Sequence, residues 1–218
     1  MREEVIEQAI DGINEGSWDG RIFMRPLMEN ISIARVWLGM PKGEGTWEEG
    51  DRFYFIFEES GQKCVGAVLD MGANDLHVFM KSEYRRRGIM SRALKRVVLP
   101  HLFEDGRQEQ RATYDSPASR GLLAGVGFTL VDSSHAVMKP ENCPKVEFPV
   151  QIRVELSEAE MKSLKKRIRM AAGLLRMAEE QIAFTTAEEV CEELDFLRSD
   201  VFSVADRLED VWWKKKSP

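Results

Sequence analysis

Residues 75–99, DLHVFMKSEYRRRGIMSRALKRVVL, carry the pattern from which the fold class is predicted. Residues 75–81 are expected to form a β-strand, and residues 88–106 a helix in which Pro100 produces a kink or an end. Between them, three consecutive arginines run directly into Gly88. Because N–H groups at a helix N-terminus attract anions and glycine permits close approach, this order predicts a phosphate-binding turn. The alternative is a charged turn that only faces solvent.

Strands and helices alternate on both sides of this stretch. Residues 52–59 and 63–71 are predicted strands, joined as a hairpin through SGQ. Downstream, a strand (111–115) and a glycine-terminated helix (117–127) precede two strands within residues 128–139. The predicted class is therefore α/β (α+β), with one mixed central sheet and flanking helices.

The N-terminal residues are expected to be helical. Residues 3–14 have the apolar spacing of an amphipathic helix. Residues 23–39 are predicted to contain a second helix, with Pro26 in or before its first turn. Residues 40–51 read as a glycine-rich loop, so no strand is predicted before residue 52.

The C-terminal residues predict two paired helices. After a proline-containing linker, apolar residues recur at alternating spacings of three and four in two segments, as in a coiled coil. Capping boxes open both segments, Ser157 with Glu160 and Thr186 with Glu189. Residues 157–183 carry six basic and four acidic side chains, and residues 187–211 carry two basic and nine acidic ones. Opposite charge favours pairing, so an antiparallel hairpin roughly 40 Å long is expected. The predicted seams are Met161, Leu164, Ile168, Ala171, Leu175, Ala178 and Ile182 in the first helix, and Val190, Leu194, Leu197, Val201, Val204, Leu208 and Val211 in the second.

Composition excludes several classes of protein. The net charge of −6 argues against a surface that binds nucleic acid or anionic membrane as a whole. The longest apolar run, residues 121–131, is too short to span a bilayer, and the acidic N-terminus does not resemble a signal peptide. The three cysteines and three histidines are scattered, which predicts neither disulfides nor a metal site. A cytoplasmic protein without a metal is expected.

The arginine turn and two further segments resemble the GNAT superfamily of N-acetyltransferases. Residues 85–90, RRRGIM, are similar to its R/Q-x-x-G-x-G/A signature, although Met90 replaces the last small residue. SPASRGLLAGVGF (116–128) resembles its second motif, and CVGAVLDM (64–71) the strand with a Val-Gly pair. The resemblance covers residues 52–139 in the family's order. The G-x-G-x-x-G and G-x-x-x-x-G-K-[ST] motifs of NAD and ATP sites are absent from the sequence.

The resemblance implies a site for acetyl-CoA as co-substrate. The pyrophosphate would rest on N–H groups of Arg86 to Ser91, and the pantetheine would lie along the end of the preceding strand. The Met80 N–H would polarise the thioester carbonyl. The implied cofactor-binding residues are Phe79, Met80, Lys81, Arg85, Arg86, Arg87, Gly88, Ile89, Met90 and Ser91.

The catalytic residues are less well indicated. The tyrosine that often protonates the leaving thiolate in this family falls at Leu123, which has no proton to donate. Tyr114 is the preferred replacement, with Ser116, Ser119 or water as alternatives. Asp75 is the preferred base for the amine, with Glu58 and His77 as alternatives. Tyr114 and Asp75 also have structural interpretations, as a strand-packing residue and a turn residue.

These observations predict three segments and two alternative functions. Residues 1–140 would form a GNAT-like acyl-CoA-binding domain, residues 141–156 a linker, and residues 157–218 the helical hairpin. The first function is transfer of acetyl from acetyl-CoA to an amine of a small molecule or a protein, by direct attack. The second is an interaction or regulatory protein of the same fold that acts through its hairpin. A homodimer or a protein partner is expected at residues 157–213, and neither membrane nor nucleic acid is expected as a partner.

Overall fold

The computed structural model describes residues 3–17, 21–37, 50–149, 155–185 and 187–216. The chain divides into two compact units, Met1–Arg153 (the first unit) and Val154–Pro218 (the second unit). Within the described ranges, no helix has both the length and the apolar character needed to cross a membrane.

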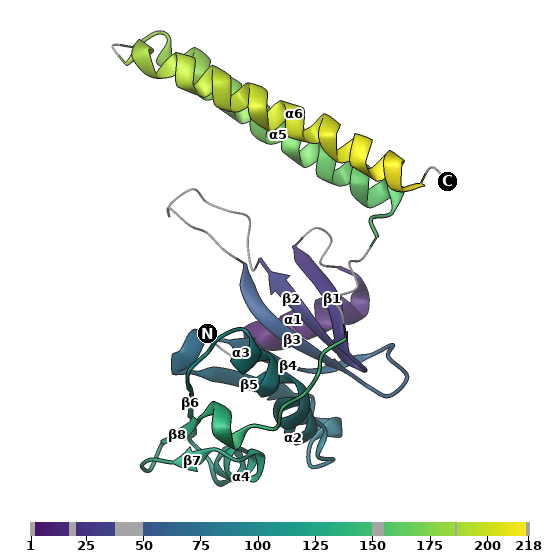
Figure 1. Cartoon of the computed structure of the whole chain (residues 1–218), viewed down its shortest axis with the longest axis vertical. Helices are drawn as coiled ribbons and strands as arrows, with labels where there is room; N and C mark the ends of the chain where they lie inside the picture. Colours follow the sequence, from purple (N-terminus) through teal and green to yellow (C-terminus); the bar gives the residue numbers. More distant parts are fainter. Residues whose placement is uncertain (1–2, 18–20, 38–49, 150–154, 186, 217–218) are drawn as a thin grey trace. The chain divides into compact units, whose positions relative to one another are not determined.

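The first unit contains two antiparallel sheets (Figure 1). The larger sheet has five strands in chain order, and the smaller has the order β6-β8-β7. The fold is therefore α+β, but the strands form two hydrogen-bonded sheets where one central sheet was predicted. The strands are β1 (Ile22–Met28), β2 (Ile31–Val36), β3 (Asp51–Phe57), β4 (Cys64–Asp70), β5 (Leu76–Met80), β6 (Gln110–Thr113), β7 (Thr129–Leu130) and β8 (His135–Met138).

The helix predicted within residues 23–39 is wrong, because this segment forms the β1–β2 hairpin. Ile22 pairs with Val36, and the register continues to Met28 opposite Ile31. Asn30 has φ 57°, a left-handed conformation that asparagine tolerates and that allows the tight turn. Pro26 is acceptable because β1 is an edge strand, where a missing N–H need not interrupt a ladder.

Helices cover both faces of the five-stranded sheet (Figure 1). Helix α1 (Glu3–Glu15) buries Ile6 and Ile10 against one face, together with Phe53, Phe55 and other strand residues. The opposite face, which includes Tyr54, packs against the helical run 89–104 and against α4 (Pro117–Val126). Alternate residues of β3 therefore enter two different cores, as expected for a strand buried on both sides.

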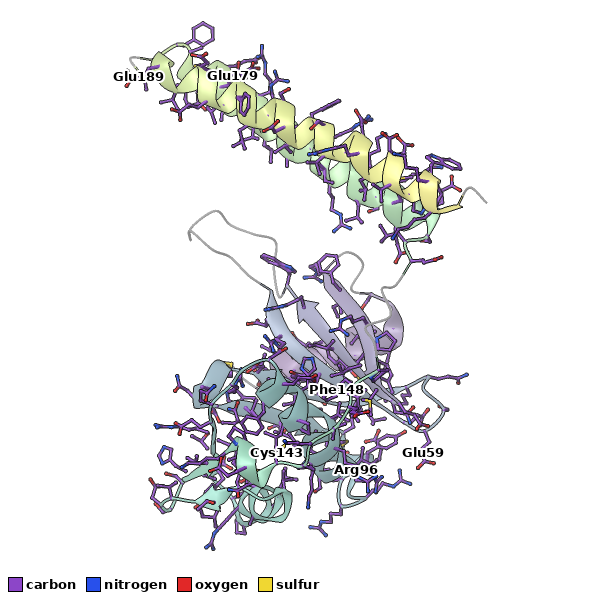
Figure 2. All side chains as sticks on the ribbon, viewed as in Figure 1. Glu59, Arg96, Cys143, Phe148, Glu179 and Glu189 are labelled. Atoms are coloured by element: carbon purple, nitrogen blue, oxygen red, sulfur yellow. The ribbon has the colours of Figure 1, made fainter. Side chains whose placement is uncertain are left out.

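The helix predicted over residues 88–106 continues through Pro100. It consists of α2 (Ile89–Ala93), a π-helical turn η3 (Leu94–Val98) and α3 (Leu99–Glu104). Proline cannot donate to the carbonyl four residues earlier and its ring clashes with that carbonyl, so a wider turn just before Pro100 accommodates it. Beyond β8, Phe148 reaches back to this layer, and its ring contacts His101 edge-on at 5.4 Å (Figure 2).

The second unit is an antiparallel pair of helices, α5 (Glu158–Ile182) and α6 (Cys191–Lys216). The predicted capping box of α5 is confirmed, since Ser157 Oγ accepts from the Glu160 N–H and Glu160 Oε2 accepts from the Ser157 N–H. Thr186, predicted to cap the second helix, lies outside the described residues. Figure 2 shows Glu179 and Glu189 near the turn between the helices.

The predicted seams are correct for only part of their length. On α6, the neighbours Ala205 and Trp212 are buried, while the predicted seam residues Val204 and Val211 are exposed. On α5, Ala172 is buried and Ala171 is exposed. Helix α6 is therefore rotated so that alternate members of its predicted seam, Val190, Leu197, Val204 and Val211, face outward, whereas in the predicted seam of α5 only Ala171 is exposed.

Candidate functional site

The free edge of β5 is the first element of the site. In an antiparallel pair, residues alternately direct their backbone groups toward and away from the partner strand. The Lys81 N–H donates to the Val65 carbonyl of β4 at 2.9 Å, so the residues of opposite parity, Val78 and Met80, direct their N–H and C=O groups away from β4. The sheet ends at β5, and the N–H and C=O of Val78 and the N–H of Met80 therefore form an open strand edge, while the Met80 C=O accepts from Arg85 Nε.

Strand β6 approaches β5 only near the first residues of β5. Gln110 Nε2 donates to the Gly72 carbonyl at 3.2 Å, and the Thr113 N–H donates to Asp75 Oδ1 at 2.9 Å. Residue numbers rise together along these contacts, so the two segments run in the same direction. Beyond Thr113 the chain continues its pairing with the segment before β8, since the Tyr114 N–H donates to the Ser134 carbonyl. No ladder joins β5 to β6 in the part of the chain that the structure describes.

The arginine turn follows directly on this edge. Arg86 and Gly88 both have positive φ, 61° and 73°. Alternating left-handed residues of this kind turn successive N–H groups to one side, an arrangement that suits anions. Within the described ranges, no backbone acceptor bonds the N–H groups of Arg86 to Ser91, whereas the Arg92 N–H bonds to the Gly88 carbonyl.

The basic side chains differ in how far they are engaged. Arg85 turns back, donating from Nε to the Met80 carbonyl at 2.8 Å and pairing with Glu3. The Arg87 guanidinium lies 5.4 Å from the centre of the Tyr84 ring, a cation–π contact. Arg86 is exposed and has no ion pair or hydrogen bond with any described side chain. It is therefore the cation most available to an anion.

Lys81 is committed to another contact. Its Nζ lies 2.5 Å from Asp11 Oδ1 of α1. The hydrogen bond to this carboxylate raises the pKa of the Lys81 ammonium above its ordinary value. Lys81 therefore stays charged, but its charge is largely neutralised before any ligand arrives.

The side chains of the predicted cofactor residues separate into two groups. Phe79 packs into the core on the α1 face, and Met90 is 8% exposed in the core on the opposite face. Met90 therefore leaves the turn clear, although it replaces a small residue of the family signature. Gly66 of the neighbouring strand β4 leaves room for Met80 and the β5 backbone, since a Cβ there would lie 2.9 Å from both the Phe79 carbonyl oxygen and Met80 Cε.

Asp75 lies at the far end of β5 from the turn. The five residues of β5, about 17 Å of extended chain, separate Asp75 from the segment that leads into the turn. Its carboxylate accepts from the Leu76 N–H, the Thr113 N–H and the Thr113 hydroxyl at 2.9 to 3.0 Å. Asp75 thus joins the two sheets, and the structure does not bring it to the arginine turn.

The acid candidates are also engaged. The Tyr114 phenol is buried and donates to the Asp132 carbonyl. Ser116 and Ser119 bond to each other in the capping box that begins α4, and Leu123 is buried in the core. None of these four side chains offers a free proton to the β5 edge.

Glu58 is the base candidate that reaches the turn. Its carboxylate accepts from the Tyr84 hydroxyl at 3.2 Å and from the Ser60 hydroxyl at 2.9 Å. Tyr84, which no sequence motif singled out, links this carboxylate to Arg87, and Lys63 Nζ also lies 5.5 Å from the centre of the Tyr84 ring. The third candidate, His77, projects from the middle of β5 and lies 3.9 Å from Asp75.

A hollow of about 440 Å³ lies at the end of the five-stranded sheet that is opposite to the arginine turn. Asp70 accepts two hydrogen bonds from Arg107 at 3.0 Å, and Arg52 bonds to Asp105 at 2.6 Å. The charged side chains lining this hollow are thus already engaged in ion pairs, and Arg52 ties β3 to the end of α3. The described residues contain no group of three or more histidine, cysteine, aspartate or glutamate side chains arranged to hold a metal.

Comparison of the chain with models of protein families gives no match, and comparison with curated proteins gives none either. The function must therefore be argued from the residues and their geometry.

Proposed function

We propose that the first unit binds acetyl-CoA along the free edge of β5 and the turn 85–91, and transfers its acetyl group to an amine. The observation that carries this proposal is the Met80 N–H, which faces away from β4 directly before an exposed turn with unbonded N–H groups. An extended ligand can add to such an edge as a further strand, and its phosphates can bind where the chain turns into a helix.

Each part of the site has a chemical role in this proposal. The N–H groups of Arg86 to Ser91 and the Arg86 guanidinium bind the phosphates. Val78 offers an outward N–H and C=O to the pantetheine amides. The Met80 N–H donates to the thioester oxygen, where negative charge develops during attack.

The transfer itself needs two proton movements. The amine nitrogen attacks the thioester carbon, the new C–N bond forms and the C–S bond breaks. Glu58 accepts the amine proton, directly or through water, because its carboxylate contacts Tyr84, the residue just before the turn. The leaving thiolate takes a proton from water, since Tyr114 and Leu123 are unsuited to supply one.

Release of free thiol from acetyl-CoA in the presence of a panel of amines tests this function. Mass spectrometry of the acceptor should show an added acetyl group. We expect Glu58→Gln to lower kcat by about 10²–10⁴-fold, the usual effect of losing a general base, with little change in KM for acetyl-CoA. Asp75→Asn is the matched carboxylate control and should retain kcat. Transfer that is unaffected by Glu58→Gln would contradict the assigned base.

A second candidate is an acyl-CoA-binding protein without catalysis. The hydrogen bond of Tyr114 to Asp132, the burial of Leu123 and the position of Asp75 all favour it, because they leave no protein acid at the edge. Binding of acetyl-CoA without transfer to any amine tested would select this candidate. Transfer would exclude it.

A further inference from the structure

The second unit has an apolar face that its own two helices leave uncovered. Contacts between the helices define which residues lie at about the same level. Lys165 pairs with Glu209 and Asp206, Arg169 with Asp206 and Glu179 with Arg198, so paired residue numbers add up to between 371 and 377. By the same rule, three apolar pairs whose numbers add up to 375 lie level across the hairpin: Leu164 with Val211, Ala171 with Val204, and Ala178 with Leu197.

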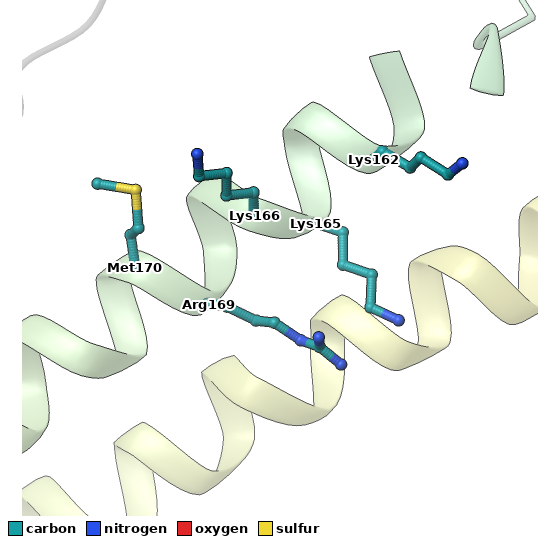
Figure 3. A pocket seen from close by; sticks show the side chains of 5 residues that line it. All are labelled: Lys162, Lys165, Lys166, Arg169 and Met170. Atoms are coloured by element: carbon teal, nitrogen blue, oxygen red, sulfur yellow. The ribbon is translucent and has the colours of Figure 1, made fainter. Parts of the chain in front are cut away.

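These three apolar pairs lie on one flank of the hairpin, here named the lateral face. At 100° per residue, they fall on one side of the lines that face the partner helix, and Lys165, Arg169 and Asp206 fall on the other side. Glu179 lies on the facing line itself, where its Oε2 is buried. Figure 3 shows Lys165 and Arg169 of the ionic flank extending toward α6, while Lys166 and Met170 point away from it. On α6, Leu197, Val204 and Val211 are 48%, 41% and 53% exposed, and on α5 Ala171 is exposed while Leu164 and Ala178 are half-buried, so the apolar flank is open mainly on α6.

The spacing of the lateral face indicates what covers it. On each helix its residues recur every seven positions, parallel to the line that already faces the other helix. A helix with two such lines contacts two neighbouring helices, as in a four-helix bundle. The hairpin supplies only one neighbour for each helix, so a second hairpin completes the arrangement.

Charge and side-chain size both select a second copy of this chain. Helix α5 carries six basic and four acidic side chains, and α6 carries five basic and seven acidic ones, with three of its basic side chains in the last turn, at 214–216. The lateral face has small residues on α5 (Ala171, Ala178) and larger ones on α6 (Leu197, Val204, Val211). When α5 of one copy lies over α6 of the other, small residues meet large ones and opposite charges meet. If α5 packed on α5 and α6 on α6, the complementarity of size and of charge would both be lost.

We propose that two copies of the chain pair through their lateral faces, with a two-fold axis along the helices, to form a four-helix bundle. In this arrangement α5 of each copy packs on α6 of the other, and the two turns lie at the same end. The interface is isologous and closed, so assembly stops at the dimer. This inference does not depend on the proposed acetyl transfer.

Light scattering coupled to gel filtration tests the dimer on the full chain. The wild type should have about twice the 25.0 kDa mass of one chain at roughly micromolar concentration and above. The double variant Leu197→Glu/Val204→Glu should be a monomer with unchanged helical circular dichroism, since both side chains are outside the α5–α6 contact. Phe202→Glu is the matched control, because Phe202 is 44% exposed on the ionic flank, 5.2 Å from Arg169. It should remain a dimer.

The orientation is tested by a spin label at Phe184, which is 93% exposed near the turn. The label is placed by Phe184→Cys in a chain that also carries Cys143→Ser and Cys191→Ser. Packed helices lie about 8–10 Å apart, so the two labels should be roughly 15–25 Å apart when the turns share an end. Turns at opposite ends would be separated by at least the length of α5, about 37 Å.

Three results would overturn the proposal. The first is a monomeric wild type throughout the concentration range. The second is a dimer that persists in Leu197→Glu/Val204→Glu, which would mean that another surface holds it. The third is a label distance near or above 37 Å, which would exclude the parallel arrangement of the two hairpins.

Discussion

The Asp75 carboxylate binds both the backbone N–H and the hydroxyl of Thr113, at 2.9 and 3.0 Å. This contact joins the edge strand of the large sheet to the edge strand of the small one. After this contact, no strand pairs with the outer side of β5 among the described residues. The open edge of β5, on which the proposed site depends, therefore begins directly after Asp75.

Replacement of Asp75 should affect stability more than ligand binding. Asp75→Ala removes three acceptor contacts at the junction of the sheets, and we expect a loss of about 1–3 kcal/mol in the free energy of unfolding. Urea denaturation measures this loss. Thr113→Val removes only the hydroxyl bond and should cost about 0.5–1.5 kcal/mol. If Asp75→Ala abolished acetyl transfer at unchanged stability, Asp75 would be the catalytic base after all.

Gly66 should tolerate no side chain. A Cβ at this position meets the Phe79 carbonyl oxygen, a backbone atom that cannot move without displacing β5. We expect Gly66→Ala to destabilise the protein by about 1–3 kcal/mol and to weaken acetyl-CoA binding. Gly125→Ala in α4 is the control, because nothing lies within 4 Å of its Cβ and alanine favours a helix. Equal effects of the two substitutions would show that Gly66 has no special role at the edge.

Much of the fold could be predicted from local pattern, and its failures have physical causes. Alternation and turn residues located β3, β4 and β5, and Gly127 (φ 115°) ends α4 as expected. The β1–β2 hairpin was missed because its turn residue is Asn30 rather than glycine, while Pro26 suggested a helix start. Propensity alone does not separate a proline at a helix start from one in an edge strand.

For the candidate site, the sequence predicted the course of the backbone but not the partners of the side chains. The order of strand, turn and helix located the region from Met80 to Ser91, which the structure brings together as one edge and one turn. Side-chain partners depend on strand register, and so the engagement of Asp75 with Thr113 and of Tyr114 with Asp132 had no signal in the sequence. The rotation of α6 was missed for a related reason, since this helix carries two apolar lines and spacing does not say which one faces its partner.

His101 should make stability depend on pH. It is 5% exposed, its Nδ1 lies 3.0 Å from the Tyr54 hydroxyl, and burial lowers its pKa, an effect that the nearby Asp105 partly opposes. Below about pH 6.5, His101 therefore binds a proton more readily in the unfolded chain than in the folded protein. We expect the free energy of unfolding to fall as pH drops from 7 to 5, by less than about 1.4 kcal/mol per pH unit for this group.

Urea midpoints measured at several pH values check the role of His101. His101→Gln keeps a polar side chain near Tyr54 but removes the titration, so its pH dependence should be shallower than that of the wild type. His135 is exposed, so His135→Gln should have the same dependence of the free energy of unfolding on pH between pH 7 and 5 as the wild type. A His101 variant with the slope of the wild type would assign the effect to other groups.

The pair Glu179 and Arg198 should show strong coupling. Arg198 Nε lies 3.6 Å from Glu179 Oε2, and both atoms are buried without a hydrogen bond among the described residues. Each side chain has a second partner, Arg176 for Glu179 and Asp195 for Arg198, so removing one side chain leaves the other partly compensated. Arg198→Leu and Glu179→Leu should each be destabilising, and the double variant Glu179→Leu/Arg198→Leu should cost less than the sum of the two single changes. A double-mutant cycle from thermal unfolding measures the coupling. Additive single effects would show that the two groups do not interact.

Calorimetric titration of acetyl-CoA into the purified protein tests the central claim most directly. The wild type should bind with a roughly micromolar Kd, and Gly88→Glu, which places a negative charge in the turn, should weaken binding by about 100-fold or more, 2.8 kcal/mol. Gly16→Glu is the matched control, because Gly16 has φ 67° against 73° for Gly88 and has open space around it; it should bind like the wild type. No binding by the wild type, or equal binding by Gly88→Glu, would contradict an acyl-CoA site on this turn.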